Sequence, residues 1–381
     1  MSLPRRAGVH LKNRGPVSLN KSERVTRPPA VDMASVRRVL IIKLSAFGDI
    51  IHALPVAEAL KRSFPHIEAT WAIDETFAPL LAGNPTVDHV LTLPRARGKQ
   101  LRSVSYHREY FRTLRDIRKR RFDLTLDLQG LTKSALVAAA SGAPLRLAYH
   151  WLREAASFFE RPIPRDPASV HVVDQYLDVA RFLGAKVDRP HFPFNIPAED
   201  DAAAAAMLSE CGVDPDAPFV AVNPATARAV KQWGAKQYAG LLDDFYDRGG
   251  QRGVIVTADR GVAGAVEECT TRPVANLAGK TTLKQLAAVL HRSAVHVCGD
   301  TGSGHLAAAL SRPVIAIVGP TDADRSCPYG QRANVVRHIE QCSATCNWHH
   351  CQYAPPRCLE SITVDEVAEK VRSAMSVRTS E

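Results

Sequence analysis

The feature that most constrains the fold is an alternation of short apolar runs with longer helical segments, which starts near residue 36. Apolar runs typical of strands occupy residues 36–44, 67–73, 87–93, 122–128, 219–222, 253–257, 295–297 and 314–318. Helical patterns occupy residues 50–64, 132–140, 172–183, 198–211, 236–248, 263–269 and 306–310. This order predicts an α/β fold with parallel sheets that carry helices on both faces.

The chain of 381 residues is long enough for two domains, each with its own core. A proline-rich passage at 162–197 separates the two runs of alternating elements. We therefore expect two doubly wound, Rossmann-like domains that face a central cleft, where ligands bind beyond the carboxyl ends of the strands. The expected division is a disordered basic tail (1–32), an N-terminal domain (33–197), a C-terminal domain (198–360) and a final helix and tail (361–381).

Composition predicts a cytoplasmic location, since the 45% hydrophobic and 23% charged fractions are those of a soluble protein. No apolar run approaches the length of a membrane span, and the N-terminus has no apolar signal-peptide core.

The net charge of +10 is local. Residues 1–32 contribute +5 and residues 95–121 contribute +9, so the rest of the chain is slightly acidic. In the second segment Tyr106, Tyr110, Phe111, Leu114 and Ile117 recur at helical spacing, which predicts a basic helix with an apolar stripe. Such a pattern is typical of a helix that binds an anionic membrane or a phosphorylated substrate. It is equally typical of a helix that packs on its own domain and exposes its charged face to solvent. Nucleic acid binding is not favoured, because no recognised nucleic-acid motif is present.

A glycine-rich turn, Asp300-Thr-Gly-Ser-Gly-His305, follows the apolar run at 295–297 and precedes a helix. The free N–H groups of the turn and the helix dipole favour a phosphate there, with Thr301, Ser303 and His305 as added donors. The alternative is an ordinary helix start capped by Asp300 or Thr301. The spacing matches neither a dinucleotide fingerprint nor a P-loop, which argues against a Rossmann dehydrogenase and a P-loop NTPase.

Two further polar segments follow strand ends. In the first, Asp49 begins a helix after Lys43, where its carboxylate can cap the helix or act as a general base, with His52 on the same face. In the second, Thr226 and Lys231 follow the strand at 219–222, as a pyrophosphate site requires. Lys231 is otherwise a surface lysine, and Trp233 is expected to pack as an anchor.

Five motifs taken together resemble the glycosyltransferase family that contains the bacterial lipopolysaccharide heptosyltransferases. They are Ser45-x-x-Gly-Asp-Ile-Ile-His-x-Leu-Pro55, Asp127-Leu-Gln-Gly-Leu-x-Lys-Ser134, Lys231-x-Trp233, Asp300-Thr-Gly-x-x-His305 and Gly319-Pro-Thr-Asp322, in the family's order. The resemblance extends from about Met33 to the C-terminus. It implies a GT-B fold, a nucleotide-sugar donor such as ADP-heptose held by the C-terminal domain, and a lipid-linked inner-core acceptor held by the N-terminal domain.

The resemblance also implies residue roles. Asp49 would deprotonate the acceptor hydroxyl, Lys231 would neutralise donor phosphate, and Thr226, Asp300, Thr301, Gly302 and His305 would hold the donor. Lys43, Ser45, His52, Gln129 and Lys133 are expected in the acceptor half of the cleft. Inverting transfer needs a base on one side of the anomeric carbon and a stabilised diphosphate on the other. A lysine and helix amides can stabilise that leaving group without a metal, so no cofactor beyond the nucleotide sugar is expected.

The loop Ala258-Asp-Arg-Gly261 departs from the glycine-rich turn that relatives often carry near the nucleotide, which leaves base recognition open. The hypothesis is a metal-independent, heptosyltransferase-like enzyme, cytoplasmic or peripheral at the inner membrane. The alternatives are a GT-B enzyme with another nucleotide sugar or acceptor, and a non-catalytic protein that binds anionic membranes or nucleic acid.

Four cysteines cluster near the C-terminus, at Cys342, Cys346, Cys351 and Cys358. Their spacing permits a zinc or iron–sulfur site but lacks paired C-x-x-C knuckles, so a metal is the less favoured interpretation. Disulfides are also disfavoured in a reducing cytoplasm.

Overall fold

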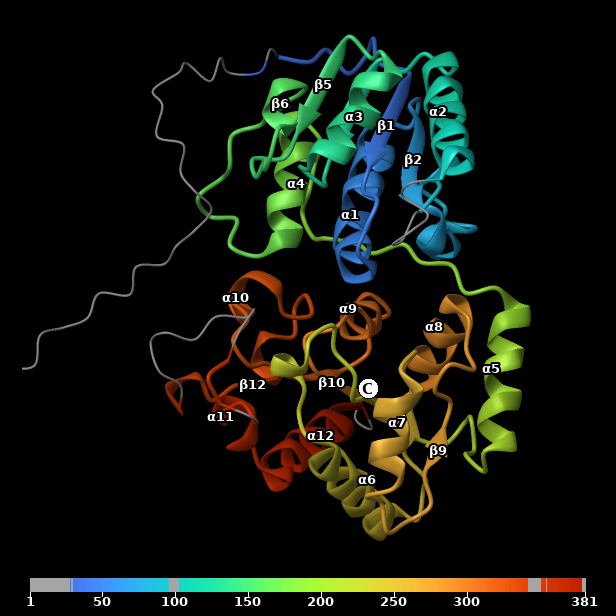
Figure 1. Cartoon of the computed structure of the whole chain (residues 1–381), viewed down its shortest axis with the longest axis vertical. Helices are drawn as coiled ribbons and strands as arrows, with labels where there is room; N and C mark the ends of the chain where they lie inside the picture. The colour runs from blue at the N-terminus through green and yellow to red at the C-terminus, as the bar shows by residue number, and fades with distance from the viewer. Residues whose placement is uncertain (1–27, 29, 96–102, 342–350, 354, 379–381) are drawn as a thin grey trace, which may run out of the picture.

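Two parallel sheets form the frame of the protein, one above the other (Figure 1). The computed structural model describes residues 28, 30–95, 103–341, 351–353 and 355–378. The upper sheet has the order β3-β2-β1-β4-β5-β6 and the lower sheet β12-β11-β10-β7-β8-β9. We call the part built on β1 to β6 the N-terminal domain and the part built on β7 to β12 the C-terminal domain.

The N-terminal sheet has helices on both faces, as expected. Its strands are β1 (Arg38–Ile42), β2 (Glu68–Asp74), β3 (His89–Leu93), β4 (Leu124–Asp127), β5 (Leu145–Ala148) and β6 (Arg161–Pro162). Helices α1 (Phe47–Ser63) and α4 (Val172–Phe182) pack together on one side. Helices α2 (Val104–Lys119) and α3 (Thr132–Ser141) pack together on the other, and η3 (Ala156–Phe158) lies against α3. A short 3-10 helix, η1 (Glu75–Leu81), follows β2.

The C-terminal sheet repeats this design. Its strands are β7 (Val220–Asn223), β8 (Val254–Ile255), β9 (Ala275–Asn276), β10 (Val295–Cys298), β11 (Val314–Ile317) and β12 (Val335–Val336). Helix α8 (Leu283–Arg292) packs between α5 (Ala198–Glu210) and α9 (Gly302–Ala309) and contacts both. Helices α6 (Ala235–Gly249), α7 (Arg260–Glu267) and α12 (Val364–Arg378) form a second group, and α10 (Ala323–Ser326) and α11 (Arg357–Glu360) are short. The helix expected in 361–381 is α12, which packs on α6.

Strand register brings the polar segments together. Ile42 of β1 pairs with Ala72 on one side and Asp127 on the other, so the segments after β1 and β4 leave the same edge of the sheet. Cys298 of β10 pairs likewise with Asn223 and Ala316. In each domain the motif-bearing loops therefore lie side by side at the carboxyl ends of the strands.

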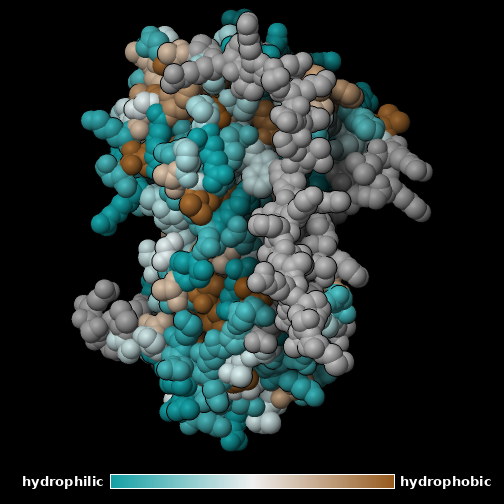
Figure 2. Space-filling view, turned by 90° about the vertical axis from the view of Figure 1, so that its left-hand side faces the viewer, coloured by the Kyte–Doolittle hydropathy of each residue, from teal (hydrophilic) through white to brown (hydrophobic). Residues whose placement is uncertain are grey.

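Several elements differ from the expectation. The expected strands appear with boundaries shifted by a few residues, but β5, β6, β9, β12 and α8 had not been predicted. Phe111 was placed on the apolar stripe of the basic helix, and this was wrong: its side chain is 65% exposed, while Ile117 is buried. No helix in the described part of the chain has the length and apolar character to cross a membrane. On the side of the molecule in Figure 2, the coloured surface of the described residues is largely hydrophilic.

Candidate active site

The two domains meet where α1 packs against α9, and two glycines make this approach possible. A Cβ on Gly48 would lie 2.5 Å from Cδ2 of His305, and a Cβ on Gly302 would lie 2.5 Å from Cδ1 of Phe47. Both distances are too short for a real contact. The glycines of the motifs at Ser45 and Asp300 therefore let the start of each helix reach the other domain.

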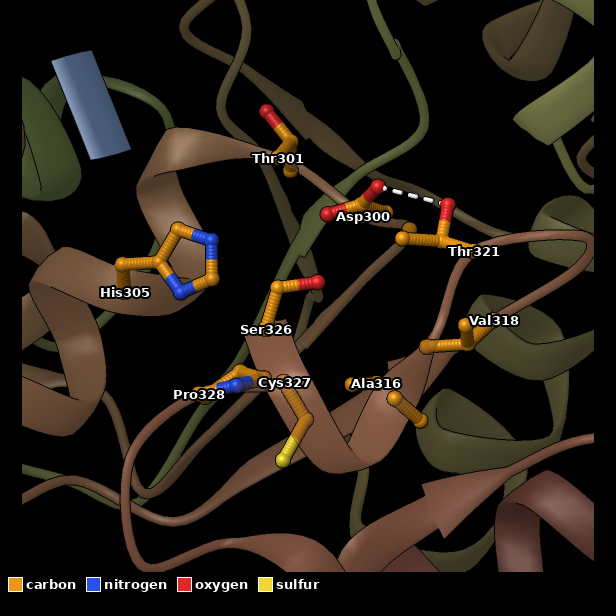
Figure 3. Close-up of a pocket in the computed structure, with 11 residues that line it drawn as sticks. Asp300, Thr301, His305, Ala316, Val318, Thr321, Ser326, Cys327 and Pro328 are labelled. Carbon is orange, nitrogen blue, oxygen red and sulfur yellow. Dashed lines mark hydrogen bonds between the residues drawn. The ribbon is translucent and has the colours of Figure 1, made fainter. Parts of the chain in front are cut away.

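Asp300 is the centre of a charged cluster in the C-terminal domain. Its Oδ2 accepts hydrogen bonds from Lys231 Nζ at 2.7 Å and from Thr321 Oγ1 at 2.9 Å. Burial opposes ionisation, but the Lys231 ammonium, with further help from Thr321, outweighs it and lowers the pKa of Asp300. Figure 3 shows the Asp300 and Thr321 side chains facing each other at one end of a small pocket. Lys231 is thus tied to the glycine-rich turn and is not an ordinary surface lysine.

The glycine-rich turn differs from the expectation in two details. Asp300 does not cap α9, because its carboxylate is committed to Lys231 and Thr321, and the N-cap residue Thr301 makes no side-chain capping bond. Ser303 was expected to face a phosphate, and this was wrong. Its buried hydroxyl lies 3.0 Å from Nε2 of His296 and accepts from Nδ2 of Asn223, so it holds the turn onto β7 and β10.

Three of the six residues expected to hold the donor line one pocket. Asp300, Thr301, His305 and Thr321 surround it together with Ser326 and Pro328 of the α10 segment (Figure 3). Thr226 lies beside this group, since its Cγ2 is the atom closest to a Cβ built on Gly299. Its hydroxyl donates to the Arg228 carbonyl.

His52 and His305 connect the domains directly. Nε2 of His52 lies 3.0 Å from Nδ1 of His305, and both rings are buried. Burial lowers the pKa of both imidazoles, with the neighbouring ring adding to the effect at His52, whereas Asp300 and Asp49 oppose it at His305. Both rings are therefore neutral at physiological pH.

Asp49 is half-buried in the first turn of α1, next to Gly48 and hence beside His305. Its Oδ2 accepts a hydrogen bond of 3.3 Å from the Ala46 N–H, so the capping contact that the sequence allowed is present. Its other carboxylate oxygen takes part in no hydrogen bond from the described residues. A base at this point can accept a proton from a hydroxyl brought to the interface.

The other N-terminal candidates connect the loops that follow β1 and β4. Lys43 is buried and donates to the Leu128 carbonyl at 2.9 Å and to the Tyr176 hydroxyl at 2.7 Å. Gln129 accepts from the Ser45 N–H at 3.1 Å, and Lys133 Nζ reaches the Ser45 hydroxyl at 3.4 Å. The loops of β1 and β4 are thereby fixed to each other, with Lys133 as the more exposed cation.

Four cross-domain contacts were missed by sequence reasoning. His171 Nε2 lies 2.8 Å from the Cys327 carbonyl, and the Tyr329 hydroxyl donates to Asp174. Arg325 stacks on Trp151, with its Cζ 4.2 Å from the ring centroid. Lys284 donates to the Ala82 carbonyl, and burial lowers its pKa to about 8. No local pattern signals such pairs, because the partners are far apart in the sequence.

The cysteine cluster is only partly described. Cys342 and Cys346 lie outside the described residues, so the metal hypothesis for the four cysteines stays a prediction. Cys358 is buried in the C-terminal core beside Leu359, and Cys351 is half-buried. The described residues contain no group of three or more His, Cys, Asp or Glu able to hold a metal ion.

Comparison with known proteins identifies the family. Residues 110–353 match the profile of glycosyltransferase family 9 (heptosyltransferase), which covers more than half of the chain. This chain belongs to glycosyltransferase family 9. It is therefore an enzyme, a glycosyltransferase, as the five motifs had predicted.

Two curated relatives are similar to large parts of this chain. The lipopolysaccharide core heptosyltransferase OpsX of Haemophilus influenzae is 24% identical over 311 residues, 80% of this chain and 85% of that protein. Lipopolysaccharide heptosyltransferase 1 of Pseudomonas aeruginosa is 30% identical over 217 residues, 56% of this chain and 59% of that protein.

Solved structures confirm the GT-B fold. A family 9 glycosyltransferase from Veillonella parvula superposes with a TM-score of 0.75 at 21% identity, over 90% of this chain and 97% of its own. ADP-heptose heptosyltransferase II of Escherichia coli gives 0.72 at 21% identity, over 90% and 99%. The heptosyltransferase WaaC of E. coli, solved with ADP-2-deoxy-2-fluoro heptose, gives 0.68 at 24% identity, over 88% and 99%.

Proposed function

We propose that this glycosyltransferase transfers heptose from ADP-heptose to the inner core of lipopolysaccharide, with inversion and without a metal. The observation that carries the proposal is the position of Asp49, in the first turn of α1, against the turn that contains Asp300 and His305 and to which Lys231 is bonded. The relatives named as lipopolysaccharide heptosyltransferases support the transferred sugar and the acceptor class, and the solved relatives named with ADP-heptose or its fluoro analogue support the nucleotide.

In the proposed mechanism the Asp49 carboxylate accepts the proton of the acceptor hydroxyl as its oxygen attacks the anomeric carbon. The bond from that carbon to the diphosphate oxygen breaks, and ADP leaves. Lys231 and the N–H groups at the start of α9 stabilise the negative charge on the leaving diphosphate. Asp300 keeps Lys231 in place, and His305 lies between the base and the leaving group.

The test combines a donor screen with a base variant. ADP-, UDP- and GDP-sugars are compared by thermal shift, and we expect selective stabilisation by ADP-heptose. Asp49→Asn should lower kcat by about 10²-fold or more while ADP-heptose still stabilises the protein, because the donor is held by the other domain. Glu58→Gln, a half-buried carboxylate of the same helix, is the matched control and should keep its activity.

Other outcomes reject parts of the proposal. Turnover by Asp49→Asn at the wild-type rate contradicts the base assignment, and stabilisation by UDP- or GDP-sugars alone contradicts the donor. Retention of the anomeric configuration in the product, followed by NMR, contradicts inversion. Loss of activity in EDTA that added metal restores contradicts metal independence.

We also propose that the enzyme works at the cytoplasmic face of the inner membrane, as a lipid-linked acceptor requires. Helix α2 supports this, because Val104 is 82% exposed and Arg108, Arg112 and Arg115 lie on its exposed surface. Vesicles with anionic phosphatidylglycerol should sediment the protein at low salt, and Phe111→Ser should weaken this binding. Equal binding to neutral vesicles, or salt-sensitive binding to DNA instead, would contradict the membrane assignment.

A further inference from the structure

Arg325 carries a positive charge into the domain interface without a counter-charge. It belongs to α10 of the C-terminal domain, and its guanidinium lies 4.2 Å from the ring centroid of Trp151 of the N-terminal domain. Its Nε atom is buried and has no hydrogen-bond partner, and in the described part of the chain no carboxylate lies within ion-pair distance of it. The residue as a whole is half-buried, and stacking on an aromatic ring returns only a fraction of the hydration that its covered atoms lose.

The carboxylates nearest in the sequence have other partners. Asp322 accepts the backbone N–H groups of Asp324 and Arg325 as the cap of α10, and Asp324 pairs with Arg332. Across the interface, Asp174 accepts the hydroxyl of Tyr329. None of these three carboxylates therefore neutralises the guanidinium of Arg325.

The surroundings of Arg325 offer donors and positive charge. Nε1 of Trp151 is a second buried donor without an acceptor. The buried cation Lys43 binds only neutral oxygens, of Leu128 and Tyr176. His52 and His171 are neutral imidazoles, whose pKa values burial lowers first and Arg325 lowers further. Buried N–H groups without acceptors beside an uncompensated cation are the complement of an anionic ligand.

We propose that Arg325 binds an anionic group, a carboxylate or a phosphate, of a substrate held between the domains. The inference rests on the proposed function, since it assigns the anion to a substrate of glycosyl transfer. Two sources share this chemistry: an acidic group of the core acceptor and the diphosphate of the donor. Arg325 belongs to the C-terminal domain and stacks on Trp151 of the N-terminal domain. Binding of the anion by Arg325 is therefore coupled to closure of the two domains.

The experiment compares Arg325→Gln and Arg325→Lys with the wild type. The KM values for ADP-heptose and for heptose-free lipopolysaccharide core are measured, with the acceptor native, dephosphorylated or carboxyl-reduced. We expect Arg325→Gln to raise one KM by about tenfold or more, and Arg325→Lys to recover part of the loss. Arg332→Gln, an exposed arginine of the same segment, is the matched control and should leave both KM values unchanged.

The result assigns the source of the anion. If Arg325→Gln raises the KM for the native acceptor but not for one of the two stripped acceptors, the group removed from that acceptor is the anion that Arg325 binds. If Arg325→Gln raises the KM for ADP-heptose, the anion is the donor diphosphate. Unchanged KM values for both substrates overturn the proposal. A KM increase that is the same for native and both stripped acceptors, with an unchanged donor KM, shows that Arg325 only holds the domains together, and also overturns it.

A second measurement separates this proposal from the proposed function. Thermal shift with inorganic phosphate requires no turnover, and Lys231→Met serves as the comparison for the donor turn. If the wild type uses no nucleotide sugar, the proposed function fails. An anion site at Arg325 is still supported if inorganic phosphate stabilises the wild type and Arg332→Gln but not Arg325→Gln. Full stabilisation of Arg325→Gln by phosphate contradicts the site.

Discussion

Nε2 of His52 in the N-terminal domain lies 3.0 Å from Nδ1 of His305 in the C-terminal domain, so a single hydrogen bond joins α1 to α9. Nδ1 of His52 is buried and has no partner. A bare nitrogen lone pair is less costly to bury than an unpaired N–H group. The favoured arrangement therefore has the proton of His52 on Nε2, donated to His305, and the proton of His305 on its own Nε2.

This tautomer leads to the first prediction. Because His52 fixes His305 as a neutral donor at Nε2, His52→Leu should lower kcat by about tenfold or more, with little change in the KM for the donor. His52→Gln keeps an N–H donor toward His305 and should recover much of the rate. Nitrogen NMR of the wild type should show His305 protonated at Nε2, and a proton on Nδ1 of His305 would contradict the arrangement.

The second prediction concerns the pair of Lys231 and Asp300. Lys231→Met leaves a half-buried carboxylate without its cation, so the pKa of Asp300 should rise and kcat/KM for the donor should fall by about 10²-fold. Lys236→Met, an exposed lysine five positions later, is the matched control and should behave as the wild type. A double-mutant cycle with Asp300→Asn measures the coupling, and additive effects would show that the two side chains act independently.

The third prediction uses two helical glycines in different surroundings. A methyl group on Gly48 would overlap His305, whereas nothing lies within 4 Å of a Cβ built on Gly264 in α7. Gly48→Ala should thus separate α1 from α9 and lower kcat by about tenfold or more, while the N-terminal domain stays folded. Gly264→Ala should keep full activity and gain about 0.5 to 1 kcal/mol of stability. Wild-type turnover by Gly48→Ala would mean that this close approach is not needed for transfer.

The sequence predicted the parts of the site that are local. The turn at Asp300 and the helix start at Asp49 were recognisable, because each combines a strand end, glycines and polar groups within a few residues. The pairing of Lys231 with Asp300 and of His52 with His305 joins positions far apart in the chain, and only the register of the sheets and the packing of α1 on α9 bring them together.

Several errors have physical causes. The strand β5 is four residues long and contains Arg146, so it lacks a clear apolar run. Helix α8 did carry a signal, because Thr282 and Gln285 form a capping box at its start. Ser303 resembled a phosphate ligand in the sequence, but its hydroxyl donates a hydrogen bond to Nε2 of the buried His296. The signal for this contact was a polar residue, His296, inside an apolar strand.

The last prediction concerns His296, which contacts Ser303 of the glycine-rich turn. Nδ1 of His296 lies 3.1 Å from the Ala221 carbonyl and Nε2 lies 3.0 Å from the Ser303 hydroxyl, an arrangement that requires the neutral ring. Burial lowers its pKa from 6.5 to about 4. The unfolded chain therefore binds a proton that the folded protein does not bind between these values. The stabilisation is complete above pH 6.5 and is lost as the pH falls toward 4, by roughly 3 kcal/mol in all.

His296→Gln removes this titration while its amide oxygen can still accept from Ser303. The difference in unfolding free energy between the wild type and this variant should be largest near pH 7.5 and shrink steadily toward pH 4.5, as measured by urea denaturation. The matched control is His191→Gln, the replacement of an exposed histidine, measured over the same pH range. A pH-independent gap for His296→Gln would mean that the pKa of His296 is the same in the folded and unfolded chain, and would contradict this prediction.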